Sequence, residues 1–437
     1  MNSYRQRLNL IPLLTGVLAV LAGCSAPLEL RDAGAARKAN DPYTLTVPLT
    51  ETDTPAGVAE RYGGTVLVWE PGDYALLGLD APPLGPQAAS AEVSRSADAF
   101  YAGGKMTAVM SGRSRVWAGG RSRVWAGGRS RVWAGGGAGL WEQGRFVWLP
   151  ENSAKWQQIR LQGAQALAPK LGAGVKVAVI DTGVDLAHPA LAEALAPASE
   201  WRDLYDGDAF PQEVGSLADD GFGHGTNVAG IIRQIAPRAT ILPLRALGPD
   251  GGGNVADVTA AIQYAASKGA RVINLSLGSE VPFEVVKKAV KKSGLKGVFV
   301  VASTGNTGDR AITFPASNSR ILGADLVAVT SVDAYDVKSW FSTYGDAVEL
   351  AAPGEGVFGP APNLSLAAWS GTSQAAPMVS GALALALGEL PTASHSGLAN
   401  LVASSSTNID KLNPRYKKQL GKGRLDLEAF VRRVLER

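Results

Sequence analysis

The chain has 437 residues, enough for one large domain with a smaller one, or for two to three domains of average size. The 42 Lys and Arg residues nearly balance the 39 Asp and Glu residues, which excludes the strong positive charge of a nucleic-acid-binding protein. Hydrophobic residues make up 46% of the chain and charged residues 19%, which predicts a globular protein with a hydrophobic core.

Residues 1–23 have the layout of a signal peptide: Arg5 and Arg7 precede an apolar run over residues 10–21, too short to predict a membrane span. The tripeptide Leu-Ala-Gly before Cys24 resembles a bacterial lipobox. This resemblance implies cleavage before Cys24 and attachment of a diacylglycerol to its sulfur. An ordinary signal peptide with an incidental cysteine is the alternative. Cys24 is the only cysteine, so no intramolecular disulfide can form.

Residues 24–41 are polar and rich in alanine and predict a tether. The next segment, 42–105, is predicted to be a small α+β module. In a secreted hydrolase precursor, a compact module before the catalytic domain indicates a propeptide, and a small binding or packing domain is the alternative. Its expected order is strand, helix, strand, strand, at residues 43–47, 56–62, 65–69 and 74–79.

Residues 112–136 repeat the sequence Gly-Arg-Ser-Arg-Val-Trp-Ala-Gly three times, which spaces Trp117, Trp125 and Trp133 evenly. A solenoid unit needs about 20 to 50 residues, so this repeat is too short to form one. We interpret residues 106–147 as a Gly-rich linker between two domains, open to proteolysis. Stacking of the interleaved Arg and Trp side chains on bases or sugars is the alternative.

Residues 148–437 have the pattern of an α/β domain. Between the apolar runs lie stretches with apolar residues at helical spacing, such as Val255, Val258 and Ile262. This alternation predicts a doubly wound, mainly parallel sheet with helices on both faces, whose active site lies at the carboxyl ends of the strands. The runs that predict buried parallel strands are 175–180, 240–244, 272–277, 298–302 and 326–332.

Asp181 and His224 are the candidate carboxylate and base of a serine hydrolase. Asp181 directly follows the buried run 175–180, where a charge is costly unless it is paired or hydrogen-bonded. His224 lies between two glycines and opens a helical run. The other two histidines, His188 and His395, lie in a turn and in a polar loop, so an imidazole-based mechanism falls on His224.

Ser373 and Asn306 are the candidate nucleophile and oxyanion donor. Ser373 is expected at the N-cap of a helix over residues 373–387, in front of unpaired backbone N–H groups. A serine at this position is usually only a cap, but the preceding Gly-Thr makes the catalytic interpretation more specific. Asn306 follows the strand at 298–302, and its amide could face the site beside the backbone N–H of Ser373. A simple turn residue after glycine is the alternative.

Residues from about 150 to 430 resemble a subtilisin-like serine peptidase, a member of the subtilase family. The resemblance implies that Asp181 orients His224, which acts as general base and then as general acid. It implies that Ser373 attacks the substrate and that Asn306 stabilises the oxyanion. It rests on six blocks in the family's order: Asp-Thr-Gly at 181, Gly-His-Gly-Thr at 223, Ile-Asn-Leu-Ser-Leu-Gly at 273, Gly-Asn at 305, Ala-Pro-Gly at 352 and Gly-Thr-Ser at 371.

The resemblance also implies where a polypeptide substrate binds. One edge strand would pair with the extended substrate, and a second segment would lie across the pocket. Pairing of this kind reads the main chain, so broad specificity is expected. The edge strand would be Ser276, Leu277 and Gly278, and the opposite segment Ala302, Ser303, Thr304 and Gly305.

Two departures from the family pattern affect the interpretation. Asn227 stands where family members often have a second histidine, which is not a catalytic position. Residues 231–235 form a shorter connection than the loop that ligates calcium in calcium-binding subtilisins. The resemblance therefore does not support that calcium site, and no metal or other cofactor is expected to be required, while calcium elsewhere stays open.

We predict a monomeric, exported serine endopeptidase that is anchored to the cell envelope by lipid on Cys24, acts on polypeptides and does not bind nucleic acid. The peptidase domain would cover residues 148–437. We hypothesise that the enzyme cuts its own linker between residues 100 and 150, which would free the catalytic domain from the lipid. The alternatives are an inactive surface binding protein on a subtilase scaffold, and an esterase, which the absence of a Gly-x-Ser-x-Gly elbow makes poorly supported.

Overall fold

The computed structural model describes residues 43–81, 92–95, 100–102, 116–117, 141–142, 145–146 and 149–437. The predictions made for residues 1–41, including Cys24, and for most of the repeat at 112–136 lie outside the described residues. Residues 38–437 belong to one compact unit. None of the described helices is long and apolar enough to cross a membrane.

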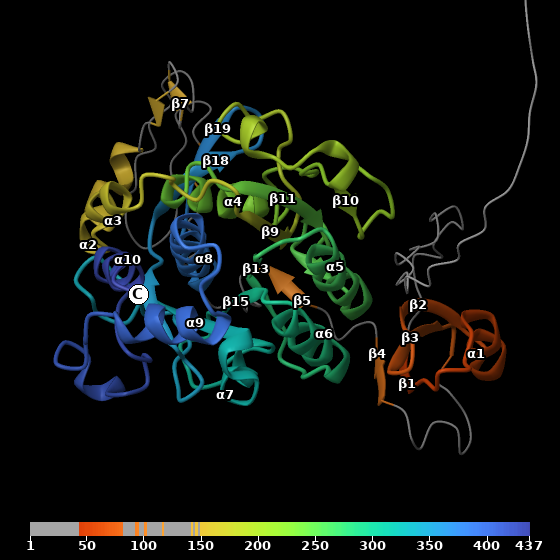
Figure 1. Ribbon diagram of the computed structural model, residues 1–437. Helices are drawn as coiled ribbons and strands as arrows, with labels where there is room; N and C mark the ends of the chain where they lie inside the picture. Colours follow the sequence, from red (N-terminus) through yellow and green to blue (C-terminus); the bar gives the residue numbers. More distant parts are fainter. Residues whose placement is uncertain are drawn as a thin grey trace, which may run out of the picture. The chain divides into compact units, whose positions relative to one another are not determined.

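A seven-stranded sheet forms the centre of the α/β region (Figure 1). Every neighbouring pair in it is parallel, and nearly all of its residues are buried. The prediction of a doubly wound parallel sheet is confirmed. In spatial order the strands are β10 (Arg202–Asp203), β11 (Thr240–Arg245), β9 (Lys176–Asp181), β13 (Val272–Leu275), β15 (Phe299–Ser303), β16 (Leu326–Val332) and β17 (Leu350–Pro353).

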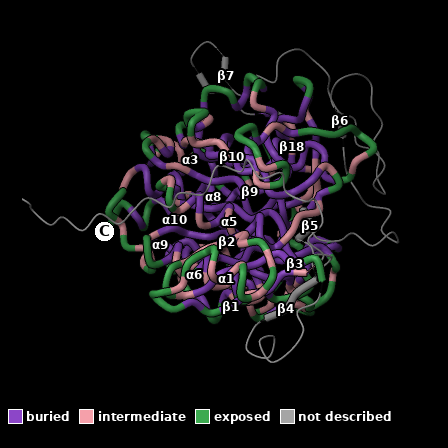
Figure 2. The backbone as a smooth tube through the Cα atoms, turned by 90° about the vertical axis from the view of Figure 1, so that its right-hand side faces the viewer, coloured by how far each residue is buried: buried purple, intermediate pink, exposed green. Residues whose placement is uncertain are grey.

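Helices cover both faces of this sheet, as the alternating side chains of β9 show. Val177 and Val179 join a core cluster with α4 and α8, whereas Ala178 and Ile180 join a second cluster with α5 and α6. The central strands and helices are the most buried part of the chain (purple in Figure 2). The helices after residue 149 are α2 (Ser153–Gln158), α3 (Leu161–Leu167), α4 (His224–Ile235), α5 (Val255–Ser267), α6 (Glu284–Leu295), α7 (Ser319–Leu322), α8 (Thr372–Glu389), α9 (His395–Ser404) and α10 (Leu427–Leu435).

The strand order reverses at β9. The chain first adds β11 and β10 on one side of β9 and then β13, β15, β16 and β17 on the other. In doubly wound sheets the ligand site lies at such a reversal, beyond the carboxyl ends of the strands. The carboxyl end of β9 is Asp181.

A smaller four-stranded sheet precedes this region. Its spatial order is β2–β3–β1–β4, and α1 packs against it through Val58. The first three strands and the helix match the predicted positions, whereas the fourth strand was not predicted. The elements are β1 (Tyr43–Pro48), α1 (Pro55–Tyr62), β2 (Thr65–Glu70), β3 (Tyr74–Leu79) and β4 (Glu92–Arg95).

Three small sheets bring distant parts of the chain together. In one, β5 (Phe100–Ala102) lies between β12 (Gly252–Gly253) and β14 (Leu277–Gly278), antiparallel to both. In the second, β19 (Ser365–Trp369) lies between β18 (Val357–Ala361) and β6 (Val116–Trp117), again antiparallel. The third is a hairpin of β7 (Trp141–Glu142) and β8 (Arg145–Phe146). The run predicted as one strand over 272–277 is therefore two, β13 and β14, which join different sheets.

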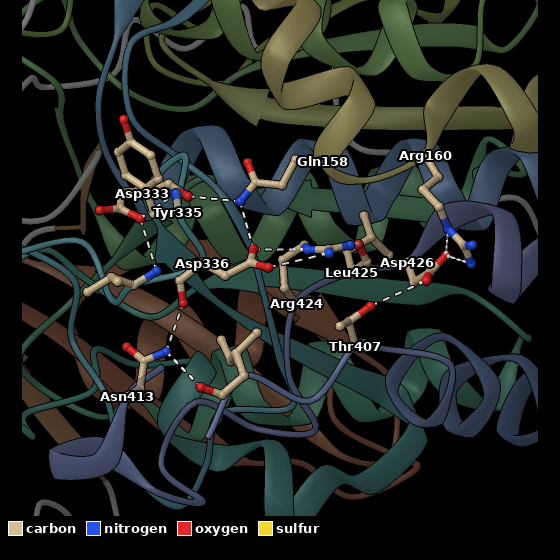
Figure 3. A network of polar contacts seen from close by, with 12 residues as sticks. Gln158, Arg160, Asp333, Tyr335, Asp336, Thr407, Asn413, Arg424, Leu425 and Asp426 are labelled. Atoms are coloured by element: carbon tan, nitrogen blue, oxygen red, sulfur yellow. Dashed lines mark hydrogen bonds and ion pairs between the residues drawn. The ribbon is translucent and has the colours of Figure 1, made fainter. Parts of the chain in front are cut away.

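The C-terminal segment is fixed to the edge of the large sheet by a polar network (Figure 3). The backbone of Ala351 in β17 pairs with Gly423 and Leu425 at 2.8 Å each. Arg424, between them, donates to both carboxylate oxygens of Asp336, at 3.0 and 3.4 Å (Figure 3). The chain after residue 405 thus extends the sheet by backbone pairing and is held there by a charge pair.

Candidate active site

Asp181 and His224 meet because two elements place them there. Asp181 is the last residue of β9 and His224 the first residue of α4, and Nδ1 of His224 lies 2.7 Å from Oδ1 of Asp181. Both side chains are buried. The backbone N–H of Thr182 donates to the same carboxylate oxygen at 2.8 Å. A side chain at Gly225 would overlap the Gly183 carbonyl oxygen, so glycine is required where α4 approaches β9.

The remaining ring nitrogen of His224, Nε2, is buried and has no hydrogen-bond partner in the described part of the chain. It is therefore open to a further group. The other two histidines are engaged elsewhere. The prediction that His395 lies in a polar loop is wrong, because it is the first residue of α9. His188 contacts the carbonyl oxygen of Ser365 at 3.3 Å, and His395 contacts that of Val298 at 3.1 Å. Burial lowers the pKa of both.

Ser373 lies in the first turn of α8, which begins at Thr372 with Gly371 as its N-cap. The expectation that Ser373 itself is the N-cap is wrong by two residues, although the residue still faces the amino end of the helix. The Ser373 hydroxyl donates to the carbonyl oxygen of Ser276 at 3.1 Å. The hydroxyl is thus held on the backbone of the segment expected to bind substrate.

A second contact fixes the backbone of Ser373. Pro377 has no N–H, so the Ser373 carbonyl lacks its usual helical donor four residues ahead. The hydroxyl of Ser276 donates to this carbonyl at 2.7 Å instead. Asn274 in turn donates to Ser276 at 2.9 Å and accepts from Ser380 at 2.8 Å. This buried network ties the first turn of α8 to the end of β13 and holds Ser373 in place.

Asn306 lies beside the residues that precede Ser373. Its side-chain oxygen accepts from the backbone N–H and the hydroxyl of Thr372, at 2.8 and 3.0 Å. These two bonds fix the direction of the amide nitrogen, Nδ2. A β-carbon placed on Gly371 marks one point close to both donors: it would lie 3.1 Å from Asn306 Nδ2 and 3.6 Å from the Ser373 backbone nitrogen. The two nitrogens therefore border the same small region, the arrangement that an oxyanion site requires.

The residues expected to bind substrate lie in two segments, and contacts connect each segment to the start of α8. Leu277 and Gly278 are β14, which pairs with Ala102 and Tyr101 of β5. Ala302 and Ser303 end β15, and Thr304 and Gly305 continue the chain as buried residues. The Gly305 N–H donates to the hydroxyl of Thr372 at 3.1 Å, which joins this segment to the start of α8.

Sequence reasoning missed three features of the site. The first is β12, the second edge that flanks β5; its only signal is the run of glycines at 251–253. The second is Trp369, whose ring packs edge-on against that of His224 with centroids 5.3 Å apart. The third is Glu213. No pattern in the sequence distinguishes this residue from the exposed acids of the same loop.

Glu213 is buried behind the Asp181–His224 pair. One carboxylate oxygen accepts from the backbone N–H and the hydroxyl of Thr226, at 3.1 and 2.9 Å, in the first turn of α4. Burial raises the pKa of Glu213 to about 7, and the charge of Asp181 adds to this, while hydrogen bonds to the carboxylate oppose it. Glu213 thus braces the turn that carries His224.

The residues described contain no group of three or more His, Cys, Asp or Glu side chains that could hold a metal ion. The arrangement of Asp181, His224 and Ser373 needs none for its chemistry.

Comparison with known proteins agrees with this fold. The profile of the subtilase family matches residues 172–423. Thermitase of Thermoactinomyces vulgaris is 37% identical over 272 residues, 60% of this chain and 90% of thermitase. Subtilisin BL of Lederbergia lenta is 34% identical over 291 residues, 64% of this chain and 99% of that protein. Among solved structures, a protease of Pseudoalteromonas arctica PAMC 21717 is similar with a TM-score of 0.56 and 26% identity, covering 65% of this chain and 98% of that one.

The chain is a serine-type endopeptidase. Its parallel sheet carries an Asp–His pair where the strand order reverses, and a serine lies at the start of a helix. The chain belongs to the subtilase family.

Proposed function

We propose that the chain is an exported endopeptidase precursor that hydrolyses polypeptides through Asp181, His224 and Ser373. The observation that carries this proposal is the buried 2.7 Å contact between Asp181 and His224, with Nε2 of His224 left open. Asp181 holds the ring so that Nδ1 carries a proton and Nε2 can accept one. The tautomer follows from the fixed acceptor at Nδ1.

A bound substrate would release the nucleophile. The Ser276 carbonyl, which now accepts from the Ser373 hydroxyl, lies one residue before the strand that pairs with β5. An extended substrate in the register of β5 presents its own backbone to Ser276. A backbone N–H of the substrate would donate to the Ser276 carbonyl in place of the Ser373 hydroxyl. The hydroxyl would then turn to Nε2 of His224. Binding and activation of the serine would then be coupled.

The reaction follows from these positions. The Ser373 oxygen attacks the peptide carbonyl while His224 takes its proton, and the resulting oxyanion accepts hydrogen bonds from Asn306 Nδ2 and the Ser373 N–H. His224 then gives the proton to the leaving amine. Water, deprotonated by His224, hydrolyses the ester formed on Ser373. Replacing Asn306 with alanine should lower kcat by about 10²- to 10³-fold with little change in KM.

We also propose that the precursor cuts itself. The chain direction of β5 runs toward Ser373, because Tyr101 lies opposite Gly278 and Ala102 opposite Leu277. A substrate chain that kept this register for one more residue would bring the residue after Ala102 opposite Ser276. The expected cut is therefore between Gly103 and Gly104, within the range of 100 to 150 expected from the sequence. The module before the cut would act as a propeptide.

Labelling and turnover test this function directly. A fluorophosphonate probe should label the wild type on Ser373, and casein should be hydrolysed. Ser373→Ala should abolish both, with a loss of about 10⁶-fold in kcat, and should leave the precursor uncut. Ser267→Ala, at the last residue of α5, is the matched control and should behave like the wild type. An unlabelled but folded wild type would indicate the inactive binding protein instead.

Anchoring by lipid on Cys24 is a separate proposal that rests on the lipobox resemblance. In the Ser373→Ala background, which keeps the chain intact, labelled palmitate should enter the wild-type sequence and not a Cys24→Ser variant. Mass spectrometry of the active enzyme should show a species that starts at Gly104 and lacks the lipid. A full-length lipidated enzyme at steady state would contradict release.

A further inference from the structure

The repeat at 112–136 has one described dipeptide, Val116–Trp117, and it is β6. It pairs antiparallel with β19, with Val116 opposite Ala368 and Trp117 opposite Ala367. The first copy of the repeat thus does more than connect two domains: it adds a strand to a sheet edge of the peptidase.

The edge that it occupies belongs to the active site. β19 ends at Trp369, whose ring packs against His224, and the chain then passes through three residues to Ser373. β19 is also held by α4, because the side chain of Asn227 donates to the Ala367 carbonyl at 3.1 Å. Asn227 is the position where the family often has histidine. A peptide added to β19 therefore lies on a rigid support beside the catalytic residues.

The direction of β6 matches that of a substrate after the cleaved bond. β5 runs toward Ser373, whereas β6 runs from Ala368 to Ala367, away from it. The two strands together have the polarity of one chain passing through the site. They are not a continuous substrate, however, because residues 103–115 separate them. β6 therefore takes the place on β19 that we expect for the part of a substrate after the cleaved bond, but it places no peptide bond at Ser373.

The second and third copies lie outside the described residues, but they carry the same dipeptide. Val124–Trp125 and Val132–Trp133 have the same neighbours in sequence as Val116–Trp117. Each doubling of a flexible loop lowers the local concentration of its end only about threefold, so the longer connections do not exclude the later copies. Tethered segments of this length reach local concentrations of about a millimolar, enough for a weak strand addition to be populated.

We propose that the repeats are tethered peptide ligands of the β19 edge, which compete with the part of a substrate that follows the cleaved bond. This rests on the proposed function, because a cut after Gly103 leaves all three copies on the peptidase. After the cut, the N-terminal module and β5 would leave together. The repeats would stay attached to the peptidase and pair with the edge of β19. The ligand is recognised by its backbone, which pairs by strand addition, and the repetition raises its occupancy.

Kinetics on two kinds of substrate test the competition. Internally quenched peptides carry residues on both sides of the cleaved bond, whereas peptide p-nitroanilides carry none after it. Replacing Val and Trp by Pro in all three copies removes the N–H groups that pair with β19. This variant should lower KM for the quenched peptides by about tenfold and leave the anilides unchanged. Prolines at Gly119, Gly127 and Gly135, outside the paired dipeptides, are the matched control.

The repetition makes a sharper prediction. Prolines at Val116 and Trp117 alone should lower KM for the quenched peptides by only about a third, because two equivalent copies remain. An effect as large as that of the triple variant would show that only the first copy binds. Equal changes with both kinds of substrate, or equal effects of the control prolines, would overturn the proposal.

Direct binding separates this inference from the proposed function. The synthetic peptide Gly-Arg-Ser-Arg-Val-Trp-Ala-Gly should bind a Ser373→Ala chain that lacks residues 112–135, as measured by calorimetry, and the same peptide with Pro-Pro in place of Val-Trp should not. No turnover is needed for this experiment. Absence of binding at millimolar peptide would reject the inference. Binding of the peptide, together with a folded wild type that does not hydrolyse casein, would reject the proposed function alone.

Discussion

Two parts of the chain are attached to the α/β region by different kinds of polar contact. At the C-terminal end, Arg424 and Asp336 pair at 3.0 Å with side chains only 10% and 18% exposed (Figure 3). The N-terminal module instead uses Glu70 and Asp73, which pair at 2.8 to 3.0 Å with lysines of α6 that are 33% to 42% exposed. One attachment is shielded from water, and the other is partly exposed to it.

This difference fits the self-cleavage proposed above. Exposed pairs contribute little and are screened by salt, so they fix an orientation without making the contact permanent. Val68, Tyr74 and Leu76 of the module pack into the cluster formed by α5 and α6, which supplies the apolar part of the contact. A buried pair is costly to break because the remaining charge loses its partner. The partly exposed contact is what the proposed release of the module requires, whereas the buried pair holds the C-terminal segment on the peptidase.

Breaking the buried pair should have the largest effect. Arg424→Met leaves the Asp336 carboxylate without its cation, and the free energy of unfolding should fall by about 3 kcal/mol. Urea unfolding in the Ser373→Ala background, which prevents self-digestion, measures it. Lys422→Met, two residues away and exposed, is the control and should stay within about 0.5 kcal/mol of the parent. Equal midpoints for the two variants would refute the comparison.

Glu213 differs from both attachments, because it is a buried carboxylate to which no cation is bonded among the described residues. Its pKa is raised to about 7, mainly by burial. Between the ordinary value of about 4.5 and 7 the folded chain keeps the proton and the unfolded chain loses it, so stability should fall as the pH rises through this window and level off above it. The loss should be of the order of 3 kcal/mol.

The measurement is urea unfolding at several pH values, again on Ser373→Ala. Glu213→Gln cannot ionise, and its profile should be flatter by the same amount between these pH values. The absolute stability of the variant is not the test, since the new amide also changes the hydrogen bonds to Thr226. If the stability of the Ser373→Ala protein does not fall between pH 4.5 and about 7, the pKa of Glu213 is not raised by folding.

The sequence predicts the large sheet well because its strands are buried on both faces and appear as continuous apolar runs, such as 326–332. It predicts Asp181, His224 and Ser373 as neighbours only through the family resemblance, since nothing local links β9, α4 and α8. The short strands β6 and β12 are two residues each and have no pattern of their own. Their pairing depends on partners more than 100 residues away, which no local signal encodes.

The smallest expected effect is at the open contact between the module and α6. Lys292 pairs with both Glu70 and Asp73. Burial raises the pKa of Asp73, but hydrogen bonds and charges from Lys292 and Lys288 outweigh this and leave it below its ordinary value. Lys292→Ala removes one cation from two partly exposed carboxylates, which should weaken the retention of the cut module by about fivefold.

The rate at which activity appears after self-cleavage reports release of the module. At roughly 0.05 M salt Lys292→Ala should become active about five times faster than the wild type, and at roughly 0.5 M salt the two should converge, because the charges are then screened. Lys291→Ala, the neighbouring exposed lysine of α6, should match the wild type at both salt concentrations.

Acid should remove the difference between Lys292→Ala and the wild type, as salt does. The pKa of Asp73 is lowered, so its carboxylate stays charged until the pH falls through that lowered value. A difference that persists at high salt would mean that Lys292 contributes through packing of its aliphatic chain on Tyr74, whose ring lies 5.5 Å from the ammonium, and not through charge.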